Sequence, residues 1–592
     1  MAPGDLNRTQ TAPEKLSRLP TRASLRRARS SPEDDAHQLF SPQFMDDHGA
    51  HHYHVSATRD AQSDDEVDAD MEKIESPVSD DTLSATTAGE SHEEEVRFGV
   101  VNSRDLEAGP SRLELKREKT SRSFKDPNLV TWDGPDDPDN PKNWAFRKKW
   151  AATLIVSSFT FISPVSSSMV APALGKIGED LGISQRVELS LTLSIFVLAY
   201  AIGPLFLGPL SEIYGRVIVL QLSNLFFLVW NIACGFAQTP GQLIAFRFLS
   251  GLGGSAPLAL GGGVLSDCWH AEERGKAISI YSLAPLLGPA VGPLAGGFIA
   301  MKTTWRWCFW STSMVDAGVQ VLGLIYLRET YAPKLLTDRA KKLRKESGNQ
   351  NYHTEWEHPD RTLGKVLRGS LVRPFRLLGT QPIIQALALY MAYLYGLMYL
   401  VLSTFPSVWE NVYGENVGIG GLNYISLGVG FFLGTQICAP INDRIYRKLK
   451  LRNNNEGKPE FRVPLMVPGA CLVPIGLFIY GWSARRSVHW IVPNIGAAIF
   501  AAGTIMGFQC TQTYIVDAYS RYAASAVASA VVLRSLAGFG FPLFAPYMYN
   551  ALGLGWGNSL LAFIGIFLGI PAPILLWKYG PTLRAKSTYA AG

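Results

Sequence analysis

Long apolar segments recur along most of the chain, and they constrain its fold more than any other feature. The first, within "RKKWAATLIVSSFTFISPVSSSMVAPAL", follows three cations and contains about twenty mostly apolar residues, the length that a bilayer demands of a helix. About eleven further segments have comparable lengths, and most contain the roughly 17–25 residues that a span needs. They lie near residues 188–210, 217–237, 241–265, 278–300, 306–327, 383–405, 419–441, 463–482, 489–516, 521–548 and 557–577. We therefore predict twelve membrane-spanning helices.

The polarity pattern also selects the class of membrane protein. A closed β-barrel would need short segments of alternating polarity, so these long apolar runs predict an all-α protein. Charged residues make up only 18% of the chain, against about 25% in a typical soluble domain. They are concentrated before the first span, in stretches such as "DDEVDADMEKIESPVSDD". This N-terminal region buries too little apolar surface to offset its ordering entropy, so we predict a disordered tail.

Cations near the span ends predict the orientation. Arg147, Lys148 and Lys149 precede the first span, and further clusters follow the sixth span, the eighth span and the last. An even number of spans places all of these on one side, which the positive-inside rule makes cytoplasmic. We predict a multi-pass protein of the plasma membrane with both termini in the cytoplasm. Its parts would be a tail (1–145), a six-helix bundle (146–327), a cytoplasmic connector (328–380), a second six-helix bundle (381–580) and a short cytoplasmic tail (581–592).

Acidic residues recur at equivalent span ends in the two halves. Glu212 ends the second span as Asp443 ends the eighth, and Asp267 ends the fourth span as Asp517 ends the tenth. Two parallel, pseudo-symmetric halves are an arrangement that secondary transporters use.

Several motifs resemble those of one transporter family. "GPLSEIYGR" resembles the loop motif of the major facilitator superfamily, "RFLSGLGG" its fourth-span arginine motif and "GPAVGPLAGG" the fifth-span motif of its antiporter branch. "NPKNW", "RETYAP" and "LRSLAGFGFPLFAPYMY" narrow the resemblance to the fungal twelve-span drug:proton antiporters, over about residues 132–580. Glu212 stands where the superfamily usually has Asp.

The resemblance implies a charge latch that closes the cytoplasmic side. Gly208 and Gly215 would permit a sharp connection between spans. Glu212 would face the positive N-terminus of the eleventh span, and Arg216 would pair with Asp267. The other half offers a similar set, and the alternative for both is ordinary membrane-flanking charge. That second set is Asp443, Arg444 and Asp517.

Arg247 lies inside an apolar span, where a guanidinium costs at least about 2.5–3.5 kcal/mol and so needs partners in the bundle interior. The resemblance gives it a role in proton coupling, in which it shifts the proton affinity of a nearby acid or water. The alternative is a structural hub that binds backbone carbonyls. Glu188 is one candidate acid, and the buried Asp316 is either a structural partner or a proton carrier.

The stretch "GPAVGPLAGG" places helix-breaking residues inside an apolar span. Gly288, Gly292 and Gly296 recur every four residues and share one helix face, which permits close helix packing. Pro289 and Pro293 form an adjacent row that can bend the helix, and Gly297 ends the motif. We predict a bent, close-packed seam against a helix of the other half, by analogy the eighth span.

The resemblance places a substrate pocket near the midplane, between the halves. Aromatic and amide side chains there suit large, flat, partly apolar or cationic compounds. Arg534 would bind anionic groups or neutralise Asp517. Few acids lie at mid-span, which favours hydrophobic drugs or secondary metabolites over polyamines. The candidates are Tyr281, Tyr390, Tyr395, Phe405, Gln509, Gln512, Arg534 and Phe541.

The resemblance and the motifs together predict proton-coupled efflux of small molecules by alternating access. The alternatives are a polyamine exporter and a transporter-like sensor. We expect no enzyme, since the histidines lie mostly in the tail and connectors, and no ATP-driven pump, since no GxxxxGK[ST] motif is present. We also expect a monomer with no cofactor besides the proton, no metal and no nucleic-acid partner; its partners would be the substrate and the lipid bilayer.

Overall fold

The protein is described by a computed structural model that covers residues 126–270, 273–357, 363–587 and 589–590. Within these ranges the chain is helical, apart from one isolated bridge between Leu129 and His353. The predicted disorder of residues 1–125 lies outside the described residues.

The first half contains eight α-helices. The first span continues from α3 through a short 3-10 turn into α4, and the fourth span is interrupted at Ser255 between α7 and α8. The helices are α3 (Phe146–Ser168), α4 (Leu174–Asp180), α5 (Arg186–Tyr214), α6 (Arg216–Gly235), α7 (Pro240–Gly254), α8 (Ala256–Cys268), α9 (Arg274–Lys302) and α10 (Arg306–Tyr326).

In the part of the chain that the structure describes, two helices connect the halves and seven more follow. The connector contains α11 (Ala332–Ser347) and α12 (Leu363–Thr380). The second half contains α13 (Pro382–Asn411), α14 (Val417–Leu422), α15 (Tyr424–Arg452), α16 (Met466–Ser483), α17 (Ile491–Ala518), α18 (Ala523–Gly569) and α19 (Pro571–Ala585).

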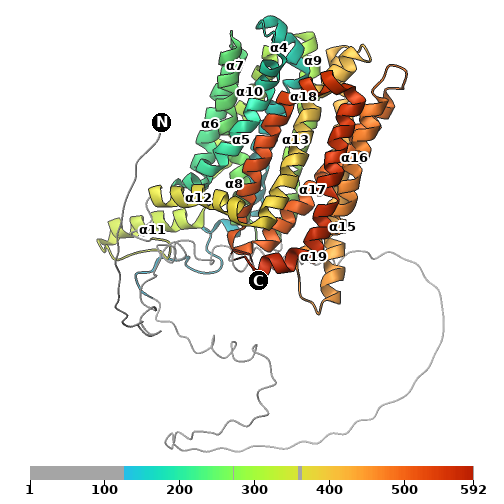
Figure 1. Ribbon diagram of the computed structural model, residues 1–592. Coiled ribbons are helices and arrows are strands. Elements are labelled where there is room, and N and C mark those ends of the chain that lie inside the picture. Colours follow the sequence, from blue (N-terminus) through green and yellow to red (C-terminus); the bar gives the residue numbers. More distant parts are fainter. Residues whose placement is uncertain (1–125, 271–272, 358–362, 588, 591–592) are drawn as a thin grey trace, which may run out of the picture.

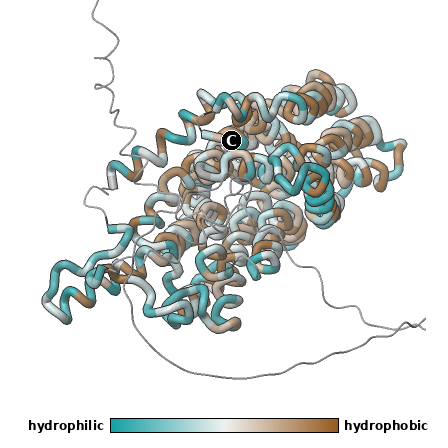
Figure 2. Tube along the Cα trace, turned by 90° about the horizontal axis from the view of Figure 1, so that it is seen from below, coloured by the Kyte–Doolittle hydropathy of each residue, from teal (hydrophilic) through white to brown (hydrophobic). Residues whose placement is uncertain are grey.

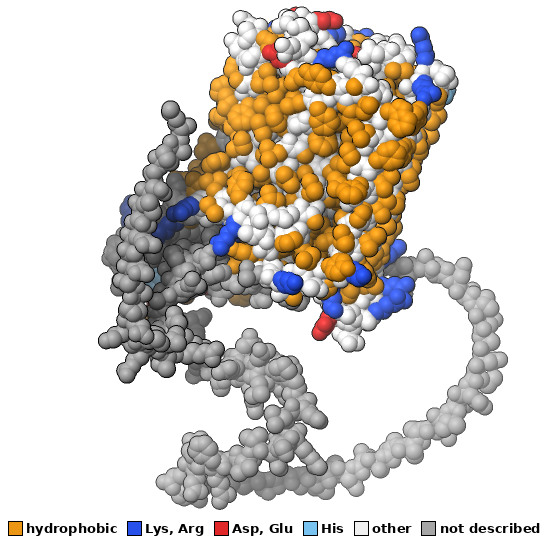
Figure 3. Space-filling view, in the orientation of Figure 1, with side chains coloured by type: hydrophobic (Ala, Val, Ile, Leu, Met, Phe, Trp, Pro, Cys, Tyr) orange, Lys and Arg blue, Asp and Glu red, His pale blue; other side chains and the backbone are white. Residues whose placement is uncertain are grey.

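The described residues make twelve apolar passes when the break inside the last long segment is taken into account. Eleven segments of the described residues are long and apolar enough to span a membrane, and the last of them, Ala523–Ala585, contains 63 residues. A helix of that length would measure about 95 Å, far more than the roughly 30 Å of a hydrocarbon core. Gly553, with φ 71° and ψ 173°, breaks α18 into two passes. Hydrophobic side chains cover the flank of the bundle and charges gather at its ends (Figure 3), which confirms the predicted all-α membrane fold.

The two halves meet at two places. α5 packs against α18, and α9 packs against α14 and α15. We call the end where α11 and α12 lie the connector end; it is the lower end in Figure 1, and the C-terminus lies there as well (Figures 1 and 2). α12 joins the halves at this end because it packs against α5 on one side and against α13 and α18 on the other.

The segment before α3 differs from the prediction. We expected residues 1–145 to be disordered, but residues 126–145 pack onto the connector. Val130 N donates to His353 O at 2.8 Å, and Asp137 accepts a bond from Arg339 of α11 at 3.0 Å. Asp137 also accepts the backbone N–H groups of Asp133 and Asp139, so a buried carboxylate organises the segment despite its low hydrophobicity.

The glycine row of "GPAVGPLAGG" packs against a different helix from the one predicted. A Cβ at Gly288, Gly292 or Gly296 would lie within 2.1–2.7 Å of atoms of α3 or the residue after it, in the same half. The contact with the other half is made by the next row, since a Cβ at Gly297 would lie 2.9 Å from Val417 O. The glycine row therefore packs α9 against the first span. The adjacent row, with Ala290, Pro293 and Gly297, meets α14 and α15, which together form the eighth span that we predicted as the partner.

Candidate functional site

At the connector end of the first half, a cation and two acids form a compact cluster. Arg216 Nε lies 2.5 Å from Asp267 Oδ2, as the loop motif predicted. Glu329 accepts the backbone N–H groups of Arg216 at 3.0 Å and Val217 at 3.2 Å. These are unsatisfied donors at the start of α6, so Glu329 caps that helix at its positive end. The cluster joins the start of the third span to the ends of the fourth and sixth spans.

Glu329 was missed at the level of sequence, although it stands in the quoted "RETYAP". Its carboxylate explains why Gly215 precedes α6. Gly215 has φ 107°, and a Cβ there would lie 2.5 Å from Glu329 Oε2. Gly208 has no such role, because it lies inside α5 with open space around its Cα.

The second half has a similar cluster with an unexpected cation. Arg462 donates to Asp443 at 2.7 Å and to Asp517 at 3.0 Å. The predicted cation, Arg444, is exposed to solvent instead. Arg462 lies in the 3-10 turn Pro459–Arg462 that precedes α16, and its side chain is only 4% exposed. In the sequence, the signal that could have identified Arg462 is that it stands directly before an apolar run.

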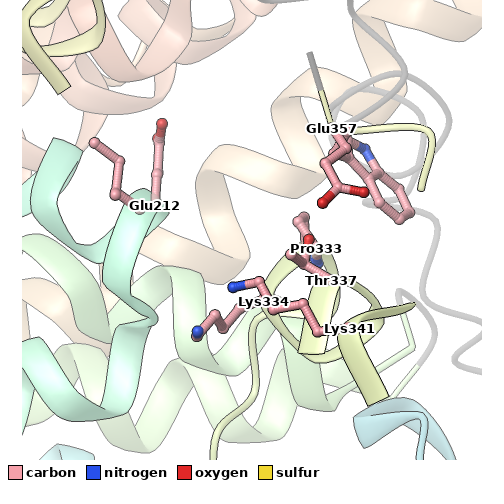
Figure 4. Close-up of a pocket in the computed structure, with 8 residues that line it drawn as sticks. Glu212, Pro333, Lys334, Thr337, Lys341 and Glu357 are labelled. Atoms are coloured by element: carbon pink, nitrogen blue, oxygen red, sulfur yellow. The ribbon is translucent and has the colours of Figure 1, made fainter. Parts of the chain in front are cut away.

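Glu212 lies between the first cluster and the connector. It lines a cleft at the connector end with Pro333, Lys334, Thr337 and Lys341 (Figure 4). Burial lowers the pKa of Arg373 on α12, against the opposing effects of Tyr522, Tyr589 and Glu212 in that order. The connector thus supplies cationic surroundings to Glu212, whereas the predicted contact with the eleventh span stays a prediction. None of the predicted pocket residues lines this cleft.

Arg247 is completely buried and has no carboxylate partner among the described residues. Its guanidinium donates to the carbonyls of Ser166 and Ser167 on α3, at 3.0 and 2.9 Å. It also donates to Thr192 O and Leu193 O on α5, at 3.1 and 3.5 Å. These bonds satisfy the guanidinium and tie three spans together, which is the arrangement expected of a structural hub.

Asp316 lies at mid-span on α10 and is 0% exposed. Both of its oxygens accept from Asn224 Nδ2 on α6, at 3.1 Å. No cation pairs with it among the described residues. Two turns from Asn224 along α6, Asn231 donates to Thr312 and Ser313 and accepts from Ser166. A continuous polar face therefore runs from Asp316 toward Ser166, whose carbonyl binds Arg247.

Several predicted pocket residues belong to the packed interior of one half. Tyr390 and Phe405 are 2% and 0% exposed and sit in the hydrophobic core of the second half. The Tyr281 hydroxyl donates to Pro257 O at 3.0 Å and holds α9 against α8. Phe541 packs on Gly396 and on the ring of Phe544. Neighbouring helices of the same half pack around these four side chains, and their place in a substrate pocket stays a prediction.

The other candidates lie on helices that meet near the centre. Arg534 of α18 lies over the ring of Tyr395 at 4.9 Å and over Phe508 of α17 at 5.0 Å. Gln509 is half-buried beside Phe508, and Gln512 is exposed. The cluster reaches the first half, because the ring of Tyr395 packs on that of Tyr399, whose hydroxyl lies 3.2 Å from Ser167. Phe508 and Tyr399 were not among the predicted residues.

Comparison with known proteins agrees with this architecture. The family model described as Major Facilitator Superfamily matches residues 156–542. The fold is similar to that of the xylose transporter XylE from E. coli in a partially occluded inward-open conformation, with a TM-score of 0.55 and 17% identity. That match covers 73% of this chain and 98% of XylE.

Curated relatives are similar over nearly their whole length. Efflux pump vrtL of Penicillium aethiopicum is 56% identical over 83% of this chain and 97% of its own. MFS-type transporter penM of Penicillium rubens is 43% identical over 82% of this chain and 94% of its own. These relatives are transporters rather than enzymes. The chain belongs to the Major Facilitator Superfamily, among its fungal efflux transporters.

Proposed function

We propose that the protein exports small organic molecules in exchange for protons by alternating access. The connector end, with its cation-rich helices α11 and α12, faces the cytoplasm in this proposal, and the membrane is the plasma membrane. The substrate enters from the cytoplasm or the inner leaflet, and an inward-moving proton drives its release outside. The efflux pumps among the relatives support the direction of transport.

The observation that carries proton coupling is the buried carboxyl group of Asp316. A charge at mid-span without a counter-ion is costly in hydrocarbon, whereas a protonated carboxyl is neutral. Met314 and Val315 beside it are 62% and 60% exposed on the flank of the bundle, so the carboxyl lies just beneath the lipid-facing surface. Asp316 is therefore a site at which gain and loss of a proton change the energy of the helix pair α6–α10.

Arg247 would transmit that change to the substrate pathway. Loss of the proton places a negative charge on the polar face that ends at Ser166, and Arg247 binds the carbonyl of this residue. The carbonyls of Ser166 and Ser167 lie at the end of α3, beside the residues that contact the second half. In this proposal Arg247 acts through backbone positions and does not itself carry the proton.

The clusters at the connector end would set which side is open. Arg216–Asp267 and Arg462 with its two acids each tie span ends within one half. Glu212 and α12 lie where the halves adjoin, so they would close that side when the pathway opens outward. We propose this as the latch that the loop motif implies.

Replacement of Asp316 by Asn tests the proton site. Asn keeps the shape of the side chain and a hydrogen bond to Asn224, but it cannot change its charge. We therefore expect the stimulation of efflux by an imposed pH gradient to fall at least tenfold in proteoliposomes. Downhill movement of the same compound should continue. The measurement is substrate flux with and without a pH gradient and with a protonophore.

Asp316→Glu is the matched control and should retain the response. Asp180→Asn removes an acid that pairs with Arg306 at the opposite end of the bundle, and it should leave coupling intact. Full pH-gradient coupling in Asp316→Asn would refute Asp316 as the proton site. Wild-type flux that ignores the gradient would refute antiport.

A further inference from the structure

We propose that the central cluster around Arg534 binds an anionic group of the substrate, and that the exported compounds are aromatic anions such as carboxylates or phenolates. This inference rests on the proposed export function and specifies its substrate class. It differs from the sequence expectation of hydrophobic or cationic compounds. It follows from the one mid-span cation that the described residues leave without a polar partner.

Among the described residues, the guanidinium of Arg534 has aromatic partners but no hydrogen bond or ion pair. Its guanidinium lies between the rings of Tyr395 and Phe508, and the buried Nε has no hydrogen-bond acceptor among the described residues. Its predicted partner, Asp517, is bound by Arg462 instead. Two rings stabilise the charge but use none of the five N–H donors, so the donors remain available to a planar anion.

Arg247 shows what a satisfied arginine looks like in the same molecule. It also lies over two rings, those of Phe196 and Phe309, yet it donates to four backbone carbonyls. Arg247 is 0% exposed, whereas Arg534 is half-buried. Arg534 therefore combines residual access with unused donors, and this combination is typical of a ligand-binding arginine rather than a structural one.

The position of Arg534 fits a substrate site. It lies near the middle of the first pass of α18, and its aromatic neighbours come from α13 and α17. Tyr399, which packs on Tyr395, reaches Ser167 of the first half. Gln509, whose Oε1 is buried without a partner among the described residues, stands next to Phe508. Rings would stack on a flat substrate while Arg534 pairs with its acidic group.

Charge also disfavours the alternatives. A polyamine would bring several positive charges against an unpaired guanidinium, and no acid lies in this cluster among the described residues to compensate. An anion that leaves the cell and a proton that enters it both make the inside of the cell more positive. An inside-negative membrane potential would therefore assist this exchange.

Equilibrium binding of two dyes tests the proposal without a proton gradient. Fluorescein and rhodamine 123 share a flat xanthene frame but carry opposite charge near neutral pH. We expect the full-length protein in a neutral detergent to bind fluorescein at least tenfold more tightly than rhodamine 123, as measured by fluorescence anisotropy. Arg534→Gln should weaken fluorescein binding at least tenfold, and Arg534→Lys should weaken it less because the charge is retained.

Arg485→Gln is the matched control, because Arg485 also lies over a ring, that of Trp482, but is exposed in the loop before α17. It should leave fluorescein binding unchanged. The proposal is overturned if the wild-type protein binds rhodamine 123 as tightly as fluorescein, if it does not bind fluorescein, or if Arg534→Gln has no effect. Should Arg534→Gln not fold, the wild-type preference decides. Because binding needs no gradient, a failure of proton coupling would leave this result intact.

Discussion

The two halves place acids at equivalent span ends but neutralise them differently. In the first half, Arg216 begins α6 and pairs with Asp267, while Glu329 caps the same helix. In the second half, Arg462 binds both Asp443 and Asp517, and Glu460 of the same 3-10 turn pairs with Arg584 of α19 at 3.0 Å. The first cluster is thus built at the capped start of a helix, whereas the second is built around one cation that two acids share.

This difference shows that duplication constrains the acids more than their partners. Glu212 and Asp443, and Asp267 and Asp517, sit where the internal repeat puts them, but the cations come from different local structures. The first cluster is continuous with the connector through Thr330, which donates to Asp267 at 3.4 Å. The second is continuous with the C-terminal helix through Glu460 and Arg584. Each half is therefore anchored to a different appended segment.

The largest expected effect is loss of the shared cation. Arg462→Leu leaves two carboxylates facing each other, so we expect a loss of stability of about 3 kcal/mol, the lower end for a broken buried pair. The lower end applies because Asp443 is 42% exposed and can be hydrated. Arg216→Leu leaves one carboxylate that still accepts from Thr330, and about half that loss is expected. Thermal unfolding in detergent, with chemical denaturation for the free energies, measures both.

Arg462→Lys controls for charge and should recover part of the loss. Arg444→Leu removes the exposed cation that sequence favoured and should change stability little. If Arg216→Leu proves the more damaging substitution, the idea that the second cluster depends on a single shared cation is wrong.

A smaller effect tests the capped helix start. Gly215→Ala forces a side chain into a left-handed backbone and brings its Cβ against Glu329, so we expect a loss of about 1–3 kcal/mol. Hydrogen exchange should rise at the first turn of α6 and remain unchanged at the start of α16. Gly208→Ala, where the added Cβ meets open space, is the control. Equal effects at both glycines would show that the cap is not what requires Gly215.

Hydropathy predicted the helical passes because span length is set by the bilayer and does not depend on tertiary detail. It also placed the break at Gly553 correctly, between the predicted spans 521–548 and 557–577, although the chain is helical up to this residue on both sides. The predicted packing of α9 against the eighth span is present, but the row beside the glycines makes it, and the glycine row itself packs against the first span. Periodicity identifies which residues share a face, whereas the helix that this face meets depends on the arrangement of all twelve passes.

Fewer residues of the candidate site could be predicted from the sequence, for a similar reason. Arg216, Asp267 and Arg247 were identified because charge in an apolar context is conspicuous. Glu329 and Arg462 were missed because a charge at a span end looks like ordinary flanking charge until its partner is known. Aromatic residues such as Phe405 and Tyr395 are alike in sequence, and only packing separates a core position from one beside Arg534.

The smallest expected effect concerns residues 126–145, which Asp137 holds against α11 and which we call the anchor of the first half. The hydrogen bond from the backbone of Asp133 has the largest effect on the pKa of Asp137 and lowers it. Burial opposes this effect, but the bond from the backbone of Asp139 and the pairing with Arg339 lower the pKa further, so that it lies below its usual value. A carboxyl whose pKa is lowered in the folded state stabilises that state above its unfolded pKa of about 4, and the contribution is lost as the pH falls through the folded value. Residues 126–145 should therefore stay packed on α11 at neutral pH and loosen below about pH 4.

Asp137→Asn should loosen the same segment at neutral pH, with about fivefold faster hydrogen exchange over residues 126–145, equivalent to about 1 kcal/mol. Asp133→Asn should do less, because the Asp133 side chain is 76% exposed although it pairs with the same Arg339. Exchange near Arg462 serves as the internal reference, since the second half has no contact of this kind with the N-terminal segment in the described residues. If Asp137→Asn also loosens the first turn of α6, the anchor reaches the Arg216 cluster; an effect confined to residues 126–145 would limit it to the connector.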